Sequence, residues 1–245
     1  MNPTCVIVPV YNHPHTIGAV SASVTAHGLP CLLVDDGSDT ACAQRLEELQ
    51  RAQTTVHLLR LPHNRGKGAA VCAGLRWARD QGYTHALQVD ADGQHDLADI
   101  PRFLDASARD PQAVITGSRR AQGISALRHY GRKVTDWLVW LETLSTQIDD
   151  SMCGYRLYPL AATVALLDAT RVGQRMDFDT DILVRLHWRG VAIAQVTTQV
   201  IYRRDIPSHF RMLRDNLRIA RMHTLLIAGM LPRAPLLLWR RWRDR

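Results

Sequence analysis

Residues 31–38 read Cys31-Leu-Leu-Val-Asp-Asp-Gly-Ser38, four apolar residues that run directly into two carboxylates, a glycine and a hydroxyl. Short apolar runs of this kind are typical of strands that are buried on both faces of a parallel sheet. The polar residues mark the end of the strand, because buried polar groups without hydrogen-bond partners are costly. The same change from apolar to polar recurs through the first half of the chain and predicts its architecture.

Five apolar runs alternate with stretches of helical periodicity between residues 5 and 116. The expected strands cover residues 5–10, 31–34, 56–61, 86–89 and 113–116. The expected helices cover residues 14–27, 40–52, 68–81 and 98–108. This alternation predicts an α/β fold with a doubly wound, mainly parallel sheet and helices on both faces. Such sheets bind ligands beyond the carboxyl ends of their strands, where this chain carries its polar residues.

The second half of the chain is mostly helical, with expected helices over residues 127–146, 159–169, 179–189 and 207–231 and a strand over 191–201. The last helix is amphipathic, because Leu213 and Leu217 share one face while arginines such as Arg214 share a neighbouring one. We therefore expect a catalytic unit over residues 1–202 and a basic amphipathic tail over residues 203–245.

Composition indicates one sizeable domain with a small appendage. The chain has 245 residues, of which 46% are hydrophobic, enough for a substantial core. Its 5 cysteines are odd in number and form no Cys-x-x-Cys pair, which is typical of reduced thiols. The N-terminus enters a strand without the basic segment and long apolar run of a signal peptide, so we expect cytoplasmic chemistry.

The positive charge of the chain lies in the tail. The whole chain carries +7, whereas residues 203–245 alone hold eleven arginines against three aspartates. Such a tail favours a polyanionic partner, either anionic lipid head groups or nucleic acid. No nucleic-acid recognition motif or set of stacking aromatic residues accompanies the charge. We therefore expect a membrane surface as the partner and no nucleic acid.

A Pro-Arg-Ala-Pro segment, residues 232–235, divides the apolar part of the tail. The runs on either side, residues 224–231 and 236–239, are short against the ~20 residues of a membrane span. We expect a peripheral anchor on the inner face of the membrane, with Trp239 and Trp242 at the level of the head groups. The alternative is that the tail packs on the domain or on a partner subunit.

Two carboxylates follow the fourth expected strand, in the sequence Asp90-Ala-Asp92. At a turn both can reach one divalent cation, and Mg²⁺ or Mn²⁺ prefers such oxygen ligands and shares them with phosphates. Gln94 offers an amide oxygen as a further ligand. The cation would neutralise the charge that grows on a leaving diphosphate. For this motif alone, a solvated acidic turn is the alternative.

Two other strand ends carry candidates for nucleotide binding. Asp36 could accept hydrogen bonds from a base N–H or a ribose hydroxyl, although the same turn equally suits a helix N-cap at Ser38 or Asp39. Asn64-Arg-Gly-Lys-Gly-Ala-Ala70 opens a helix, and Lys67 with that helix N-terminus could contact a diphosphate. A glycine-rich helix start that permits close packing is the alternative.

Five segments in this order resemble family 2 glycosyltransferases, which have the GT-A fold. They are Cys5-Val-Ile-Val-Pro-Val-Tyr-Asn12, Leu33-Val-Asp-Asp-Gly-Ser38, Asn64-Arg-Gly-Lys-Gly-Ala-Ala70, Val89-Asp-Ala-Asp-Gly-Gln-His95 and Gly117-Ser-Arg119. Asp150-Ser-Met-Cys-Gly-Tyr-Arg156 and Phe178-Asp-Thr-Asp-Ile-Leu183 are similar to segments of one branch, the dolichyl- or polyprenyl-phosphate mannosyl- and glucosyltransferases.

The resemblance implies a metal-dependent, inverting transfer of a hexose from a UDP- or GDP-sugar to a membrane lipid, with polyprenyl phosphate as the expected acceptor. With the strand-end pattern, it indicates nucleotide-sugar contacts for Pro9, Tyr11, Asn12, Asp36, Lys67, Asp90 and Arg119. It indicates metal ligation by Asp90, Asp92 and Gln94. The family usually has Asn-Glu where this chain has Asn12-His13, so the nucleobase stays open.

Whether a general base is needed depends on the acceptor. A lipid phosphate is already an anion, and Arg132 or Arg156 would bind and position it. A hydroxyl must give its proton to a carboxylate. The candidates for this base are Asp150, Asp179 and Asp181. We favour Asp150, which with Asp92 and Arg132 makes up the expected catalytic set.

Besides a catalytically inactive nucleotide-sugar sensor, which would bind without turnover, three alternatives remain open at this point. One is a glycosyltransferase that acts on a hydroxyl of another lipid or glycan. A sugar nucleotidyltransferase also pairs a parallel sheet with carboxylates, but it usually has a glycine-rich loop after the first strand, and residues 9–13 contain no glycine. The third is a binding protein that acts through its basic tail.

Overall fold

The structure is a computed structural model that describes residues 2–119, 126–200 and 211–243, without the side chains of residues 126–130 and 132. Within these residues the centre is a 7-stranded sheet in the order β3-β2-β1-β4-β6-β5-β7. The strands are β1 (Thr4–Val10), β2 (Cys31–Asp35), β3 (Val56–Arg60), β4 (His85–Gln88), β5 (Val114–Arg119), β6 (Arg156–Pro159) and β7 (Ile193–Thr198).

The sheet is mainly parallel, as expected, with one reversed strand. Strand β6 pairs antiparallel with β4 and β5, whereas the other neighbouring strands run parallel. Strand β6 was not expected from the sequence, because its four residues start with a charged one, Arg156, and form no apolar run. The strand expected over residues 191–201 is present as Ile193–Thr198.

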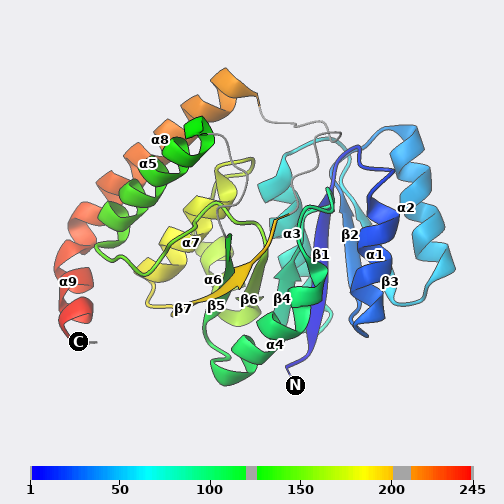
Figure 1. Ribbon diagram of the computed structural model, residues 1–245, viewed down its shortest axis with the longest axis horizontal. Coiled ribbons are helices and arrows are strands. Elements are labelled where there is room, and N and C mark those ends of the chain that lie inside the picture. Colours follow the sequence, from blue (N-terminus) through cyan, green and yellow to red (C-terminus); the bar gives the residue numbers. More distant parts are fainter. Residues whose placement is uncertain (1, 120–125, 201–210, 244–245) are drawn as a thin grey trace.

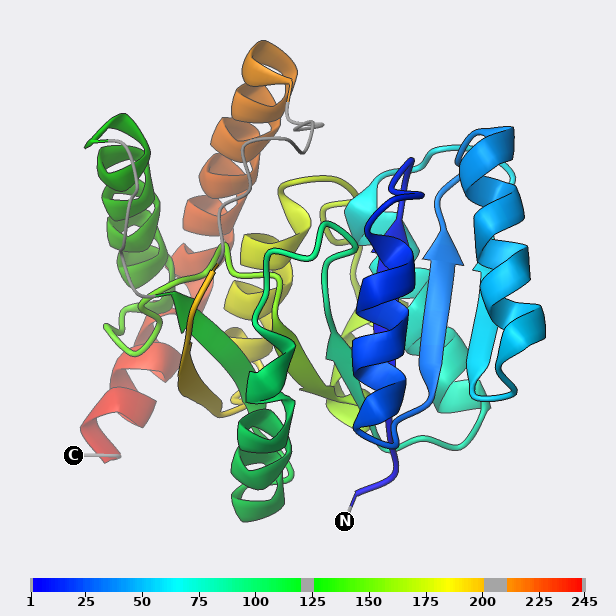
Figure 2. The ribbon, with the colours of Figure 1, turned by 45° about the vertical axis from the view of Figure 1, so that its right-hand side comes forward.

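Helices cover both faces of the sheet, because successive side chains of each strand point to opposite sides. Cys5 and Ile7 of β1 enter one core, and Val6 and Val8 enter the other. The first core is covered by α3 (Lys67–Asp80), α6 (Leu160–Ala169) and α7 (Phe178–Trp188). The second is covered by α1 (Ile17–Ala26), α2 (Thr40–Ala52) and α4 (Ile100–Arg109), the last preceded by the turn η1 (Leu97–Asp99). Figures 1 and 2 show the two layers.

Local signals set the observed element bounds within a few residues of the expected ones. Helix α2 begins where its N-cap predicts, since the carboxylate of Asp39 accepts a hydrogen bond from the Cys42 N–H at 2.9 Å. The five cysteines are buried and form no disulfide. Their burial agrees with the expected position of these thiols in the core, and their reduced state stays a prediction.

Helices α5 (Ala126–Thr143) and α8 (Met212–Met230) lie side by side at one end of the molecule (Figures 1 and 2). Helix α8 continues through the turn η2 (Leu231–Arg233) into α9 (Ala234–Arg243). Met222, Leu226 and Met230 of α8 are buried in the core that α3 and α7 cover. One face of the tail therefore packs on the domain.

The expectation that two prolines divide the tail into short pieces is wrong. Pro232 and Pro235 each lie in the first turn of a helical segment, where the missing N–H removes no helical hydrogen bond. The helical stretch Met212–Arg243 has 32 residues and is long and apolar enough to cross a membrane by length and composition alone. Only 28% of the most apolar 18-residue stretch of this helix is buried. Most of the surface of that stretch is therefore available to a partner.

Candidate active site

The ends of β1 and β4 meet where the strand order of the sheet reverses. The chain proceeds from β1 outward through β2 and β3, and β4 starts the other half. Doubly wound sheets bind ligands at such a point. Tyr11 and Asn12 follow β1, and the Asp90-Ala-Asp92 turn follows β4. Thr16 ties the two segments together, because its Oγ1 donates to the Ala91 carbonyl at 2.6 Å.

Asn12 shapes the turn between β1 and α1. Its φ of 56° lies in the left-handed region, which Asn tolerates better than most residues. Its side-chain oxygen accepts from the Asp39 N–H at 2.8 Å, and its own N–H donates to Ser38 Oγ at 3.1 Å. Pro9 is buried within β1, and Tyr11 is half-buried. The nucleotide contacts expected of these three residues stay predictions.

Asp36 anchors the glycine-rich turn before α3. Its carboxylate accepts from the N–H groups of Arg65 and Gly66 at 2.7 and 2.8 Å. Burial raises the pKa of Asp36, and these two hydrogen bonds offset that effect only in part. Gly37 packs on the same turn with φ +71°, and a Cβ there would lie 2.6 Å from the backbone nitrogen of Asn64. The end of β2 therefore fixes the position of the turn that leads into Lys67.

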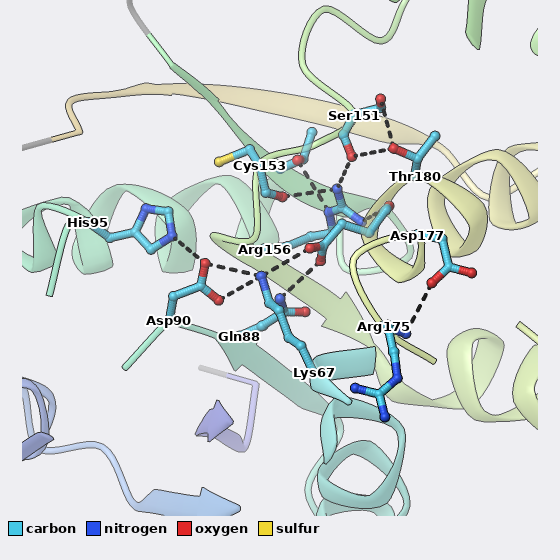
Figure 3. Close-up of polar contacts among 12 residues, drawn as sticks. Lys67, Gln88, Asp90, His95, Ser151, Cys153, Arg156, Arg175, Asp177 and Thr180 are labelled. Atoms are coloured by element: carbon cyan, nitrogen blue, oxygen red, sulfur yellow. Dashed lines mark hydrogen bonds and ion pairs between the residues drawn. The ribbon is translucent and has the colours of Figure 1, made fainter. Parts of the chain in front are cut away.

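Lys67 begins α3 and joins two carboxylates that are far apart in the sequence (Figure 3). Its Nζ lies 2.8 and 3.1 Å from the oxygens of Asp90 and 3.0 Å from Oδ2 of Asp179 in α7. Burial by itself lowers the pKa of Lys67, but the charges of Asp179 and Asp90 outweigh burial and raise it. Lys67 is therefore a half-buried ammonium at neutral pH. Gly154 packs against it, since a Cβ would lie 2.5 Å from Nζ.

The Asp90-Ala-Asp92 turn offers carboxylate oxygens to a divalent cation. Burial raises the pKa of Asp92, and the neighbouring charge of Asp90 adds to the increase. Oδ1 of Asp90 is buried without a hydrogen-bond partner, although the Lys67 ammonium lies close enough for an ion pair. Among the described residues, no three His, Cys, Asp or Glu side chains are grouped to hold a metal ion. A cation here would need ligands beyond the carboxylates, such as Gln94, water or a diphosphate.

Arg119 at the end of β5 forms a bidentate ion pair with Asp150. Its Nε and Nη2 lie 2.6 and 2.8 Å from the two carboxylate oxygens, and Asp150 is buried. A carboxylate whose two oxygens accept from one guanidinium is poorly placed to take a proton from an acceptor. This pairing does not favour Asp150 as general base, and that role stays a prediction. Asp150 orients Arg119, whose contact with a phosphate stays a prediction.

Arg156 is 0% exposed, and Figure 3 shows it among Ser151, Cys153 and Thr180. Its guanidinium donates to the main-chain oxygens of Asp179 at 2.7 Å, Cys153 at 3.0 Å and Ser151 at 3.1 Å. A side chain so enclosed has no contact to offer a lipid acceptor. The predicted acceptor contact of Arg156 is therefore wrong, and Arg156 instead holds the segment 150–155 against α7.

Two buried residues that sequence analysis missed complete this network. Gln88 in β4 donates from Nε2 to Oδ1 of Asp179 at 3.1 Å. Tyr158 in β6 donates from its hydroxyl to Oε1 of Gln88 at 3.1 Å. The available signal was an amide inside the apolar run 86–89, because a buried amide requires partners. The side chain of Arg132 lies outside the described residues, so its contacts stay predictions.

Comparison with known proteins assigns this site to a family of enzymes. The sequence model of Glycosyl transferase family 2 matches residues 5–166. An undecaprenyl-phosphate mannosyltransferase of Micrococcus luteus is 30% identical over 80% of this chain and 83% of its own length. A polyprenol monophosphomannose synthase of Mycolicibacterium smegmatis is 32% identical over 63% of this chain and 61% of its own length.

Solved structures share the fold of this chain. Glucosyl-3-phosphoglycerate synthase from Mycobacterium tuberculosis, crystallised with Mn²⁺, UDP-glucose and phosphoglyceric acid, superimposes with a TM-score of 0.65 at 16% identity, over 95% of this chain and 74% of its own. A mannosyltransferase from Pyrobaculum calidifontis with GDP-Man and Mn²⁺ has a TM-score of 0.57 at 14% identity, over 98% of this chain and 74% of its own. The GT-A fold expected from the resemblance is confirmed.

Proposed function

Since this chain belongs to glycosyl transferase family 2, we propose that it transfers a hexose, with inversion, from a UDP- or GDP-sugar to polyprenyl phosphate at a membrane. The cluster of Asp36, Lys67, Asp90 and Asp92 at the switch point of the sheet carries this proposal. Relatives named for undecaprenyl phosphate and polyprenol support the acceptor class. The catalytic unit would be residues 1–202.

The donor would lie across the ends of β1, β2 and β4. Its nucleoside would contact Pro9, Tyr11, Asn12 and Asp36. Its diphosphate would approach Lys67, Asp90 and Arg119, and Arg132 on the acceptor side would contact the phosphate of the lipid. Two positive side chains near a leaving diphosphate would stabilise the charge that develops on it.

Asp90 and Asp92 fit a divalent cation, Mg²⁺ or Mn²⁺, with Gln94 as a further ligand. Oδ1 of Asp90 has no hydrogen bond and is paired with the Lys67 ammonium at 2.8 Å, and Asp92 uses one oxygen to accept from the Gln94 N–H at 2.9 Å. When bound, the cation supplies a positive charge to the leaving diphosphate. Mn²⁺ in two solved structures of the same fold supports this assignment.

The carboxylates near the site favour an acceptor that needs no general base. Asp150 is paired with Arg119. Asp179 is held by Lys67 and Gln88. The remaining candidate, Asp181, accepts from Arg185 at 2.6 Å and from a backbone N–H at 2.7 Å. A phosphate acceptor is already an anion, so its oxygen can attack without losing a proton to any of them.

The test is turnover of UDP- and GDP-sugars with polyprenyl phosphate in detergent, in Mn²⁺, Mg²⁺ or EDTA. We expect wild type to release UDP or GDP and to form labelled lipid only with a divalent cation. Asp92→Asn should lower kcat/KM by about a hundredfold or more, because transition-state charge stabilisation by a metal is worth several kcal/mol. The matched control is Asp105→Asn, an exposed aspartate on α4. Absence of nucleotide release with every donor contradicts the proposal.

The basic tail and α5 would form the membrane-facing surface, on the cytoplasmic side. Leu213 and Leu217 of α8 and Trp137 of α5 are 81%, 70% and 60% exposed. Arg211 and Arg214 accompany these side chains and suit anionic head groups. The opposite face of α8 packs in the core. Binding of α8 to the membrane surface would therefore disrupt less packing than insertion of α8 across the membrane. The relatives named for undecaprenyl phosphate and polyprenol support a membrane surface as the partner.

A further inference from the structure

Lys67 stands at a helix position that does not favour a positive charge. It is the first residue of α3, where the unpaired N–H groups and the helix dipole already make the surroundings positive. Its side chain is only 19% exposed, so water does little to stabilise the ammonium. The compensation comes from two carboxylates, Asp90 and Asp179, which approach it from different elements.

The two carboxylates differ in their freedom to move. Asp179 is held on three sides, because its Oδ1 accepts from Gln88, its Oδ2 from Lys67, and its main-chain oxygen from Arg156 at 2.7 Å. Asp90 lies in the turn after β4, is 25% exposed at its side chain, and has Nε2 of His95 3.4 Å from its Oδ2. Asp179 is thus a fixed anion, whereas Asp90 faces the site where the cation would bind.

The ammonium blocks the carboxylate that a cation would use. Nζ of Lys67 lies within 3.1 Å of both oxygens of Asp90, where it bridges the carboxylate. A divalent cation bound to these oxygens would meet a like charge at close range, which Coulomb's law makes strongly unfavourable in a partly buried site. Lys67 must therefore move before Asp90 can serve fully as a ligand.

We infer that Lys67 is a resident counter-cation of the active site. Its ammonium neutralises Asp90 in the ligand-free protein and withdraws toward Asp179 when a divalent cation binds. The flexible side chain of Lys67 permits the movement, and the fixed carboxylate of Asp179 remains as the ion-pair partner of the ammonium. The inference rests on the cation site of the proposed function and adds an exchange between two cations within it.

The inference predicts opposite effects for two substitutions in one ion-pair cluster. Lys67→Met removes the competing charge, so Mn²⁺ should bind about tenfold more tightly than in wild type. Asp179→Asn removes the anion that receives the ammonium, so Lys67 should pair more firmly with Asp90 and Mn²⁺ should bind about tenfold more weakly. Lys133→Met and Asp105→Asn are the matched controls, since both of these residues are exposed.

The measurement is titration of the purified full chain with Mn²⁺, followed by the EPR signal of free Mn²⁺, alone and with UDP or GDP. Circular dichroism checks that each variant is folded, and Asp179→Asn keeps the test decisive if Lys67→Met does not fold. Weaker binding in both variants, or no change in either, would mean a purely structural cluster and overturn the inference. If wild type binds no Mn²⁺ even with nucleotide, the cation site of the proposed function fails as well. If wild type binds Mn²⁺ and the opposite shifts are missing, only the inference fails.

Discussion

At the scale of single residues, the same residue type has different roles according to its burial. Arg119 and Arg156 both follow polar, glycine-containing segments of the sequence. Arg119 keeps 19% of its side chain exposed at a strand end, whereas Arg156 is wholly enclosed. A buried guanidinium that satisfies several carbonyls stabilises the fold and leaves no donor for a ligand.

Arg156→Met therefore tests whether Arg156 stabilises the fold or binds the acceptor. Removal of the guanidinium leaves the carbonyls of Ser151, Cys153 and Asp179 without these donors, and we expect a loss of about 3–5 kcal/mol in the free energy of unfolding. Urea denaturation measures this loss, with Arg109→Met on the surface of α4 as the control. Unchanged stability with a raised KM for the lipid would instead restore the acceptor-binding role.

At the scale of elements, α5 and α8 are joined by a buried polar pair. Nδ1 of His223 lies 2.6 Å from Oε1 of Glu142, and their side chains are 6% and 0% exposed. Burial raises the pKa of Glu142, the hydrogen bond and charge of His223 lower it in part, and the charge of Asp181 adds to the increase. The folded protein therefore favours the protonated carboxyl more than the unfolded chain does.

This direction of the shift makes a prediction about pH. The stabilisation from a raised pKa is fully present below the unfolded value of about 4.3 and is lost as pH rises through the folded value. Glu142→Gln cannot ionise, so its stability relative to wild type should increase from pH 4 upward and then level off. Urea denaturation at several pH values, with exposed Glu48→Gln as the control, measures the difference. A difference that stays constant between pH 4 and 8 contradicts the prediction.

At the scale of the whole molecule, the N-terminal ends of α5 and α8 stand at the end toward which β1 and β2 point (Figures 1 and 2). The candidate active site lies at the carboxyl ends of the same strands. A membrane that contacts Leu213, Leu217 and Trp137 would therefore lie on the side of the molecule where a lipid-linked acceptor is needed.

Joint replacement of Leu213 and Leu217 by Ser tests this orientation. Each leucine should contribute about a tenfold gain in binding to vesicles, because burial of one such side chain is worth about 1.5 kcal/mol or more. Flotation of the full chain with anionic vesicles measures the loss of vesicle binding. Flotation with neutral vesicles measures how much of the binding depends on the charge of the arginines. Gln50→Ser on α2, at the opposite end of the molecule, is the control. Equal binding of all variants would mean that another surface meets the membrane.

The sequence by itself determined the doubly wound sheet, most element bounds and the positions of the strand-end motifs. These features depend on local rules, namely apolar runs, N-caps and glycines at turns, which are visible in a few neighbouring residues. For the same reason it located Asp36, Lys67, Asp90 and Asp92 at strand ends, which a parallel sheet brings to one edge.

Only the tertiary structure decided which charged residues pair with one another. The Lys67–Asp179 and Arg119–Asp150 pairs join residues separated by 112 and 31 positions, and no local pattern encodes such partners. It also decided that Arg156 is enclosed, that β6 runs antiparallel, and that the tail forms one helical stretch with a face in the core. Burial and pairing are properties of the packed chain, because they depend on the segments that surround a residue in space.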